Sequence, residues 1–354
     1  MRLLIHADCL DDQKAGIHTY TKEIIAHLNL TSNDGVLRLQ KDPNLTSTNQ
    51  IICPFKPLKF YKTYRLLRLL PKIINDLNPK LFWEPSHIMP MGLNKKIKKV
   101  LTIHDLSSIT LPQYHTKMNV LGHKLFLKQS IKNADTILTV SNSVKEEIID
   151  RYKPKANVIS IYNGIVQPKE VATNLPLPLE KYFIYLGTLE PRKNIELLIK
   201  SFLQIKNKIP QKLFIVGGTG WKSESIRLLI SQNSDSIKYL GFLPEPEKNF
   251  YLKNATAMIY PSFYEGFGLP IMEALNLGTP VITSNQGALK EIYQDYTIQF
   301  DPYSITDLSK ILLQISQNPE LTTPYQQQGI TYSKQFTWEK TAYQINQIFQ
   351  ELIS

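Results

Sequence analysis

The chain of 354 residues is too long for one ordinary domain and is expected to form two domains of about 170 residues each. Its composition, with 42% hydrophobic and 20% charged residues, excludes disordered and fibrous proteins. Cys9 and Cys53 lie far apart, which argues against a disulfide framework or a zinc finger. No apolar run is long enough to cross a membrane, and the run after Arg2 is too short for a signal peptide, so a cytoplasmic protein is expected.

The net charge of +11 is concentrated in the first half of the chain. Residues 1–170 hold 25 basic and 14 acidic side chains, whereas the remaining 184 residues hold 16 of each. This asymmetry indicates an anionic partner for the first half: a nucleic acid, a phospholipid surface or a substrate that carries phosphate. Segment Lys59–Asn78 mixes basic and apolar residues as an interfacial helix does. The alternative is a core-facing helix with a basic solvated side, interrupted by Pro71.

Short apolar runs alternate with amphipathic segments along the chain, which predicts parallel sheets covered by helices. Ligands of such sheets bind outside the carboxyl ends of the strands, so two units in series predict a binding cleft between them. The expected strands are Leu3–His6, Val100–His104, Thr136–Val140, Val158–Ile161, Phe183–Gly187, Leu213–Val216, Ala257–Tyr260 and Val281–Thr283.

The domain boundaries follow from two further segments. The proline-containing segment Gln167–Glu180 is the predicted linker, so the predicted domains cover residues 1–168 and 169–335. From residue 336 to 354 the apolar residues recur at alternating spacings of four and three, which predicts a C-terminal helix with one buried face. The residues of that face are Trp338, Ala342, Ile345, Phe349 and Leu352.

The segment Glu265–Gly278 (EGFGLPIMEALNLG) carries the most chemical information. Gly268 allows a tight turn, and Pro270 suits the first turn of a helix. The free backbone amides at such a helix start bind phosphate. Glu265 and Glu273 flank this helix start, and carboxylates in such a place suit the hydroxyl groups of a sugar as hydrogen-bond donors.

A second motif, LGTLEPRKN at Leu186–Asn194, also follows an expected strand. Its adjacent cations, Arg192 and Lys193, stand just before a predicted helix, where the helix dipole also favours an anion. The alternative interpretation is a solvated pair of surface cations.

The two motifs resemble those of retaining glycosyltransferase family 4. The match comprises the E-x7-E spacing of Glu265 and Glu273, the GFGLP loop and the GTPVI strand that follows, and it extends over nearly the whole chain. The resemblance implies an α/β protein of the GT-B fold, in which two Rossmann-like domains with parallel sheets face a central cleft. It also implies that the C-terminal helix crosses back to the N-terminal domain.

The resemblance further implies a role for each motif. Glu273 would hold the ribose hydroxyls of a nucleotide sugar, and Glu265 would contact the transferred sugar. Arg192 and Lys193 would hold the diphosphate and stabilise the charge on the leaving nucleoside diphosphate. The other implied donor-binding residues are Gly187, Thr188, Phe242, Phe267, Gly268 and Leu269.

Three weaker signals lie in the first half. Gly16, within Ala15–Gly16–Ile17, resembles the glycine-rich loop that approaches the diphosphate, although Ala15 replaces a second glycine common in the family. His104 and Asp105 resemble an active-site pair in which His104 contacts the sugar as a catalytic residue. Segment Trp83–His87 (WEPSH) is expected to line the acceptor pocket.

The expected activity is therefore retaining transfer of a hexosyl group, with mannosyl from GDP-mannose as the favoured donor. The acceptor is expected to be a saccharide or a lipid-diphosphate-linked saccharide in polysaccharide assembly, reached through peripheral contact of the basic half with the inner face of the cell membrane. No metal, no further cofactor and no nucleic acid are expected. The alternatives are a UDP-hexose-dependent transferase, a nucleotide-sugar epimerase and a basic binding module without catalysis. A nicotinamide dehydrogenase is disfavoured because Val216–Gly220 (VGGTG) is not GxGxxG.

Overall fold

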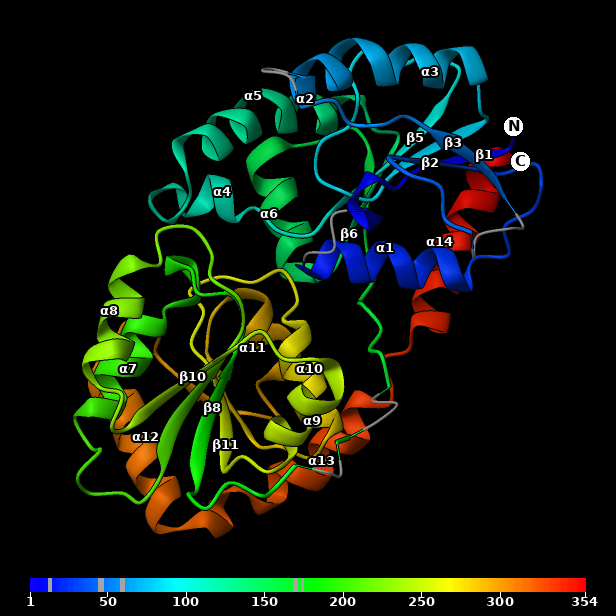
Figure 1. Cartoon of the computed structure of the whole chain (residues 1–354). Helices are drawn as coiled ribbons and strands as arrows, with labels where there is room; N and C mark the ends of the chain where they lie inside the picture. Colours follow the sequence, from blue (N-terminus) through cyan, green and yellow to red (C-terminus); the bar gives the residue numbers. More distant parts are fainter. Residues whose placement is uncertain (12–14, 44–47, 58–60, 168–170, 173–174) are drawn as a thin grey trace. The chain divides into compact units, whose positions relative to one another are not determined.

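A computed structural model describes all residues except 12–14, 44–47, 58–60, 168–170 and 173–174 (Figure 1). The chain forms two compact units, each built on a parallel sheet. Unit 1 comprises Met1–Ile109, Lys117–Gly164 and Thr337–Ser354, and unit 2 comprises Thr110–Thr116 and Ile165–Phe336. The placement of Thr110–Thr116 in unit 2 has no counterpart in the predicted domains. The predicted linker includes residues outside the described part of the chain, 168–170 and 173–174.

Unit 1 has a seven-stranded sheet in the order β3-β2-β1-β4-β5-β6-β7, and every pair of neighbours is parallel. The four strands predicted in this half are confirmed with bounds shifted by at most two residues. Strands β2 and β3 were not among the predicted strands, and β4 was expected only as a strand that ends at the segment Trp83–His87. The strands are β1 (Leu3–His6), β2 (Gly35–Arg38), β3 (Asn49–Ile52), β4 (Leu81–Glu84), β5 (Lys98–Ile103), β6 (Thr136–Thr139) and β7 (Asn157–Ser160).

The C-terminal helix packs on unit 1, as expected. Four of the five residues of its predicted face are buried, and Leu352 is half-buried. The Trp338 ring lies 6.0 Å from Tyr20 of α1, and the Phe349 ring lies 5.4 Å from Trp83 of β4. The α-helices that carry residues of unit 1 are α1 (Ala15–His27), α2 (Tyr61–Tyr64), α3 (Leu70–Leu77), α4 (Ser107–Thr110), α5 (Lys117–Asn133), α6 (Asn142–Tyr152) and α14 (Trp338–Ile353).

The described part of the basic segment at residues 59–78 supports the core-facing alternative. Leu70 and Ile74 are buried in the core of unit 1, while Lys62, Arg68 and Lys72 are exposed. The predicted interruption at Pro71 is wrong, because helical backbone continues from α2 to α3 through a π-helical stretch at Arg65–Leu69. Proline has no amide hydrogen to donate within a helix, and the local change of helix type just before it accommodates that loss.

Unit 2 has a six-stranded sheet in the order β10-β9-β8-β11-β12-β13, again parallel throughout. The four strands predicted here are confirmed, whereas β10 and β13 were not predicted. The strands are β8 (Tyr182–Leu186), β9 (Lys212–Val216), β10 (Ile237–Gly241), β11 (Ala257–Tyr260), β12 (Val281–Ser284) and β13 (Ile298–Phe300). The α-helices are α7 (Ile195–Leu203), α8 (Glu224–Gln232), α9 (Glu245–Lys253), α10 (Leu269–Asn276), α11 (Gly287–Tyr293), α12 (Ile305–Gln317) and α13 (Thr323–Ser333).

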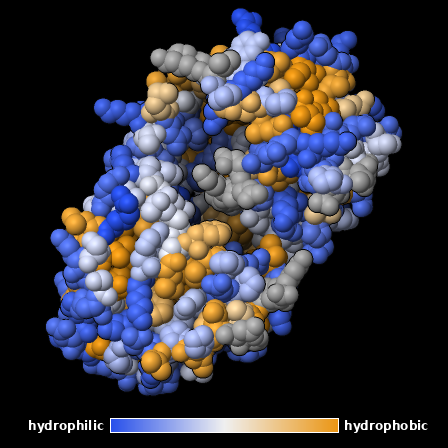
Figure 2. Space-filling model, in the orientation of Figure 1, coloured by the Kyte–Doolittle hydropathy of each residue, from blue (hydrophilic) through white to orange (hydrophobic). Residues whose placement is uncertain are grey.

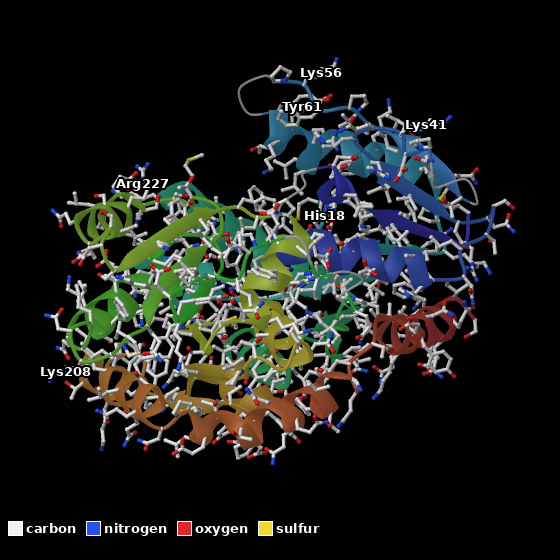
Figure 3. All side chains as sticks on the ribbon, turned by 60° about the horizontal axis from the view of Figure 1, so that its bottom comes forward. His18, Lys41, Lys56, Tyr61, Lys208 and Arg227 are labelled. Atoms are coloured by element: carbon white, nitrogen blue, oxygen red, sulfur yellow. The ribbon has the colours of Figure 1, made fainter. Side chains whose placement is uncertain are left out.

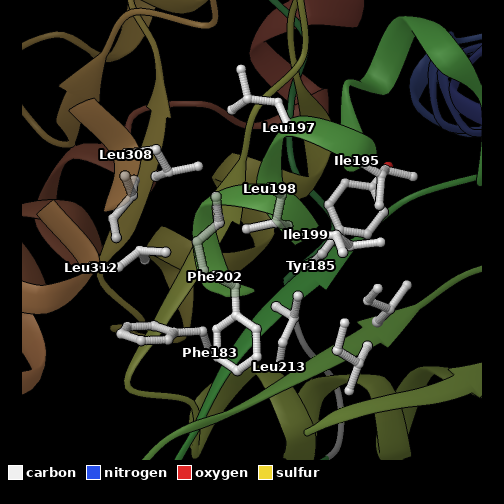
Figure 4. Close-up of a cluster of buried hydrophobic side chains, with 14 of the residues drawn as sticks. Phe183, Tyr185, Ile195, Leu197, Leu198, Ile199, Phe202, Leu213, Leu308 and Leu312 are labelled. Atoms are coloured by element: carbon white, nitrogen blue, oxygen red, sulfur yellow. The ribbon is translucent and has the colours of Figure 1, made fainter. Parts of the chain in front are cut away.

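The core of unit 2 lies between the sheet and its helices. Phe202 of α7 contributes to the same buried cluster as Phe183 of β8, and Leu308 and Leu312 of α12 also belong to it (Figure 4). Each such side chain contributes about 1.5–3 kcal/mol when fully buried. These contacts hold β8 rigidly, and β8 leads directly into the loop that carries Arg192 and Lys193.

Strand order places the functional loops. In unit 1 the order reverses between β1 and β4, and in unit 2 it reverses between β8 and β11. The loops that leave two adjacent strands at such a point diverge, which opens a crevice for ligands at the carboxyl ends. No helix among the described residues is long and apolar enough to cross a membrane. On the face shown in Figure 2, hydrophilic residues predominate and apolar residues form separate groups.

Candidate active site

The cation pair of unit 2 is positioned by a tight turn after β8. Pro191–Lys193 forms a single 3₁₀ turn, and Asn194 follows it in the left-handed region at φ 57°. The Asn194 side chain donates to the carbonyl oxygens of Pro261 at 3.1 Å and Pro302 at 2.8 Å. These hydrogen bonds tie the turn to the loops that follow β11 and β13. The backbone from which the Arg192 and Lys193 side chains extend is therefore held in place.

Glu265 lies between these cations. Its Oε1 is 2.6 Å from Lys193 Nζ, and its Oε2 is 3.2 Å from an Arg192 guanidinium nitrogen. The Tyr260 hydroxyl, at the end of β11, lies 2.9 Å from Lys193 Nζ and 3.2 Å from Glu265 Oε1. Strands β8 and β11 are neighbours at the switch point, which is why residues so distant in sequence meet there.

The charges of this cluster balance. Burial by itself would raise the pKa of the Glu265 carboxyl, but Lys193 and Arg192 outweigh burial and lower that pKa below its usual value. Arg192 also pairs with Glu190 at 2.8 Å. Burial raises the pKa of the Glu190 carboxyl, although both cations oppose the shift. The site thus holds two cations and two carboxyl groups in a poorly solvated place, where added charge is felt strongly.

The glycine-rich loop leads into α10 as predicted. Gly268 has φ 92° and caps the helix, Leu269 and Pro270 begin it, and Gly278 follows its end at φ 75°. A side chain at Gly268 would also come within 2.9 Å of Leu289. Phe267 is buried, with its ring 6.3 Å from that of Tyr293. The amides at the start of α10 are thereby set by packing behind the loop.

Glu273, on α10, makes an ion pair that the sequence did not suggest. Its Oε2 lies 2.7 Å from Nζ of Lys248 on α9, and both side chains remain partly accessible. Lys248 stands in an ordinary amphipathic helix with no motif around it, so no sequence signal marks it.

The loops after β8 and β9 approach each other closely. Gly187 donates its amide to Val216 and Leu189 donates to Gly218, at 3.0 and 2.9 Å. A Cβ atom at Gly217 would lie 2.1 Å from the Gly187 carbonyl oxygen, so backbone packing already requires that glycine. Thr188 lies in this loop pair, and its carbonyl oxygen accepts from the Tyr185 hydroxyl at 3.2 Å. Phe242 follows β10 and is 83% exposed, so its ring is free of packing contacts that would bury it.

In unit 1, His104 follows β5. Its Nε2 lies 2.8 Å from the Pro85 carbonyl oxygen, which can only accept, so Nε2 carries the proton. Burial lowers the pKa of His104, although the Pro85 contact and Asp105 oppose the shift. The ring is therefore neutral near pH 7, and Nδ1 is a hydrogen-bond acceptor. Asp105 accepts from the amide and hydroxyl of Ser107, at 2.9 and 2.6 Å.

Two further histidines surround His104. The His87 ring stacks on His104 at 5.5 Å, and His123 of α5 lies 5.6 Å from His87. Burial lowers the pKa of His87 to about 3 and also lowers the pKa of His123. His123 also hydrogen-bonds Ser108 at 2.5 Å. The sequence analysis expected both the segment that ends at His87 and His104 in the active site, whereas no sequence signal marked His123.

Two expectations for unit 1 are corrected. Trp83 does not line a pocket: it is fully buried, and its indole nitrogen donates to Thr102 at 3.0 Å. Gly16 does not lie in a loop but is the second residue of α1, which begins at Ala15. Ala15, where the family often has glycine, is a good helix former and favours a helix that includes Gly16.

A partly buried charge network at the switch point of unit 1 was not predicted. His6, the last residue of β1, lies 2.6 Å from Glu84, the last residue of β4, and 3.1 Å from Asp8. Arg65 pairs with Asp8 at 2.5 Å. Burial by itself would lower the pKa of His6, but Glu84 and Asp8 outweigh it and raise that pKa to about 10. The network joins three segments of unit 1 through charge.

No group of three or more histidine, cysteine or acidic side chains is placed to hold a metal ion in the described part of the chain. Metal independence stays a prediction.

Comparison with known proteins decides the family. The family model described as Glycosyltransferase Family 4 matches residues 30–166, and the model described as Glycosyl transferases group 1 matches residues 168–334. O-antigen chain mannosyltransferase B of Escherichia coli is 32% identical over 294 residues, which cover 78% of this chain and 76% of that protein. The chain belongs to glycosyltransferase family 4.

Other relatives agree with this assignment. O-antigen chain mannosyltransferase RfbU of Salmonella typhimurium is 27% identical over 285 residues, again covering 78% of this chain and 76% of that protein. Among solved structures, the sucrose-phosphate synthase of Thermosynechococcus elongatus matches with a TM-score of 0.80 at 20% identity, covering 99% of both chains. WaaG, a glycosyltransferase involved in lipopolysaccharide biosynthesis, matches with a TM-score of 0.73 at 12% identity, covering 99% of both chains. This glycosyltransferase has the GT-B fold.

Proposed function

We propose that this glycosyltransferase moves a mannosyl group from GDP-mannose to a saccharide or a lipid-diphosphate-linked saccharide, with retention at the anomeric carbon. The observation that carries the proposal is the cluster of Arg192, Lys193 and Glu265 at the switch point of unit 2. Two relatives are named mannosyltransferases, and the match covers 76% of each, which favours mannose.

The two cations of the cluster stabilise the leaving group. When the bond between sugar and diphosphate breaks, negative charge develops on the diphosphate, and Lys193 and Arg192 lie at the carboxyl end of β8 to stabilise it. Glu265 keeps both cations oriented before the donor arrives. Because preorganised charges need no reorientation during the reaction, their effect on the transition state is large. This cation pair takes the part that a metal ion would otherwise have, so we propose a metal-independent reaction.

The remaining groups bind and orient the donor. Glu273 is partly accessible on α10 and accepts hydrogen bonds from the ribose hydroxyls, while the backbone at Phe267, Gly268 and Leu269 binds phosphate and sugar. His104 presents a neutral Nδ1 that accepts from a sugar hydroxyl. Phe242 offers an exposed ring for the base.

The acceptor side belongs to unit 1, which holds the excess of positive charge. We propose that this charge serves a lipid-diphosphate-linked acceptor at the inner face of the cell membrane, through peripheral contact of a cytoplasmic enzyme. A UDP-hexose donor is the second candidate, favoured by HepE of Anabaena, a protein of the same fold whose structure holds UDP and glucose; it matches with a TM-score of 0.73 at 16% identity.

A thermal-unfolding panel of GDP, UDP, ADP and dTDP with their sugars tests the donor. A ligand at 100 times its dissociation constant stabilises the folded chain by about 2.7 kcal/mol. We expect GDP and GDP-mannose to raise the unfolding midpoint of the wild type and to lose most of that effect in Glu273→Ala. Stabilisation by UDP alone would replace the mannose donor with a UDP-hexose, and equal stabilisation of wild type and variant would exclude Glu273 from the site.

Product analysis then tests the reaction itself. With the stabilising donor and a mannose-terminated acceptor, the product's anomeric configuration by NMR should match that of the donor. Turnover that persists in excess EDTA supports metal independence, and turnover abolished by EDTA and restored by Mg²⁺ would overturn it.

A further inference from the structure

Helix α5 of unit 1 has an exposed apolar row. Met118, Leu121 and Leu125 are 78%, 54% and 60% exposed, although large apolar side chains in a helix usually face the core. The other side of the same helix does face the core, through Leu127 and Ile131. The row is therefore separate from the face of α5 that packs on the core, and its side chains are not part of the buried core.

Lysine side chains share this side of the helix. At about 100° per residue, the three apolar residues fall within about 60° of the helix circumference, and four lysines extend the sector to about 120°. The lysines are Lys117, Lys124, Lys128 and Lys132, and all are exposed. The helix has no acidic residue, and within the described part of the chain none of the four lysines forms an ion pair.

This combination distinguishes between kinds of partner. The core of a protein–protein interface is depleted in lysine, so a row of methionine and leucine there would not be interleaved with four lysines. Nucleic acid is bound through phosphate contacts and base edges, which leave exposed leucine and methionine without a role. At an anionic bilayer, by contrast, the apolar side chains enter the boundary of the acyl region while lysines reach the phosphates with their stems along the apolar surface.

We propose that the exposed side of α5 docks this glycosyltransferase on anionic phospholipid. The surface consists of Met118, Leu121, Leu125 and the four lysines. It differs from the described part of the segment at residues 59–78, where Leu70 and Ile74 face the core. It refines the proposed membrane contact of unit 1 but is independent of donor identity and of catalysis.

Docking through α5 would bring the membrane close to the candidate catalytic histidine, His104. The same helix carries His123, which hydrogen-bonds Ser108 and lies 5.6 Å from His87, the ring stacked on His104. A bilayer held by α5 would therefore bring lipid head groups to the helix that borders the candidate catalytic histidine. A lipid-linked acceptor would then reach the site without leaving the membrane.

Vesicle flotation with the full chain tests the surface. We expect the wild type to float with vesicles of equal parts phosphatidylglycerol and phosphatidylcholine, and not with phosphatidylcholine alone. Lys124→Gln and Lys128→Gln should each weaken binding about fivefold at low salt, and added salt should weaken the wild type similarly. Leu121→Ser with Leu125→Ser should abolish flotation.

Matched controls locate the effect. Arg227→Gln with Leu228→Ser changes an exposed basic and an exposed apolar residue on α8 of unit 2 (Figure 3) and should leave flotation unchanged. Leu67→Ser with Arg68→Gln likewise changes one exposed apolar and one exposed basic residue, in the segment at residues 59–78, and should also leave flotation unchanged. Loss of flotation in that pair and not in the α5 variants would overturn the assignment to α5. The proposal would also be overturned if the protein bound both kinds of vesicle equally or bound neither. Salt-sensitive binding to duplex DNA that is unaffected by the α5 leucine substitutions would overturn it as well. Unchanged unfolding midpoints establish that the variants are folded.

Discussion

Lys193 Nζ lies 2.6 Å from Glu265 Oε1. The two residues are 72 positions apart and come from loops after adjacent strands, β8 and β11. Their contact shows that the cations expected to serve the diphosphate are already engaged by the carboxylate expected to serve the sugar. If the donor binds as we propose, its diphosphate would share these cations with Glu265.

Lys193→Met should lower kcat by about a hundredfold to a thousandfold, because it removes a preorganised positive charge beside the leaving group. Steady-state kinetics with the stabilising donor measure this loss. Lys290→Met, which changes a lysine of α11 outside the cluster, provides the control and should retain normal turnover. A variant at Lys193 with near-normal kcat would exclude the lysine from leaving-group stabilisation.

Lys248→Met should raise the donor KM about tenfold and leave kcat nearly unchanged, because Lys248 orients the Glu273 carboxylate through a charge-assisted hydrogen bond. Lys253→Met removes an exposed lysine from the same helix and should have no effect. If Lys248→Met lowers kcat and spares KM, the residue acts on the chemical step and not through Glu273.

The His6 network predicts a loss of stability at alkaline pH. Since its pKa is raised to about 10 in the folded chain, its contribution is fully present below the unfolded pKa near 6.5 and is lost as pH rises through about 10. The difference in unfolding midpoint between wild type and His6→Gln should therefore narrow from about pH 6 to about pH 10. A difference that stays constant over this range would mean that the histidine acts by packing alone.

Gly217→Ala should destabilise the chain by about 1–3 kcal/mol, because its Cβ would collide with the Gly187 carbonyl oxygen and φ is 139°. Gly218→Ala is the matched control: nothing lies within 4 Å of its Cβ, and its effect should stay within about 0.5 kcal/mol. Chemical denaturation compares the two. Equal stability of the two variants would contradict the close approach of the loops after β8 and β9.

Phe349→Ala should cost about 3–5 kcal/mol, because the side chain is buried against Trp83 and its loss leaves a cavity between α14 and β4. Tyr343→Ala, an exposed aromatic on the same helix, should change stability by no more than about 0.5 kcal/mol. Both are measured by denaturant unfolding. A small effect at Phe349 would show that α14 contributes little to unit 1.

Much of the fold follows from short-range patterns. The alternation of apolar runs and amphipathic segments predicted parallel sheets in both halves, and eight strands were placed within two residues of their bounds. The loop motifs were equally local: Gly268 at a helix start and Gly278 after its end have the positive φ values that glycine permits. Strands β10 and β13 were missed because a polar residue, Lys238 or Gln299, interrupts the short apolar run of each.

Sequence alone determined which residue types stand at the carboxyl ends of strands, because a strand and the loop after it are contiguous in the chain. Tertiary structure alone decided which of them meet, because that depends on strand order and on contacts between distant segments. Lys193 with Glu265, His6 with Glu84 and Lys248 with Glu273 are all pairs of this kind. Tertiary structure also decided which apolar side chains are buried: Trp83 lies in the core, whereas Leu121 and Leu125 are exposed. The packing of neighbouring elements determines which apolar side chains water can reach.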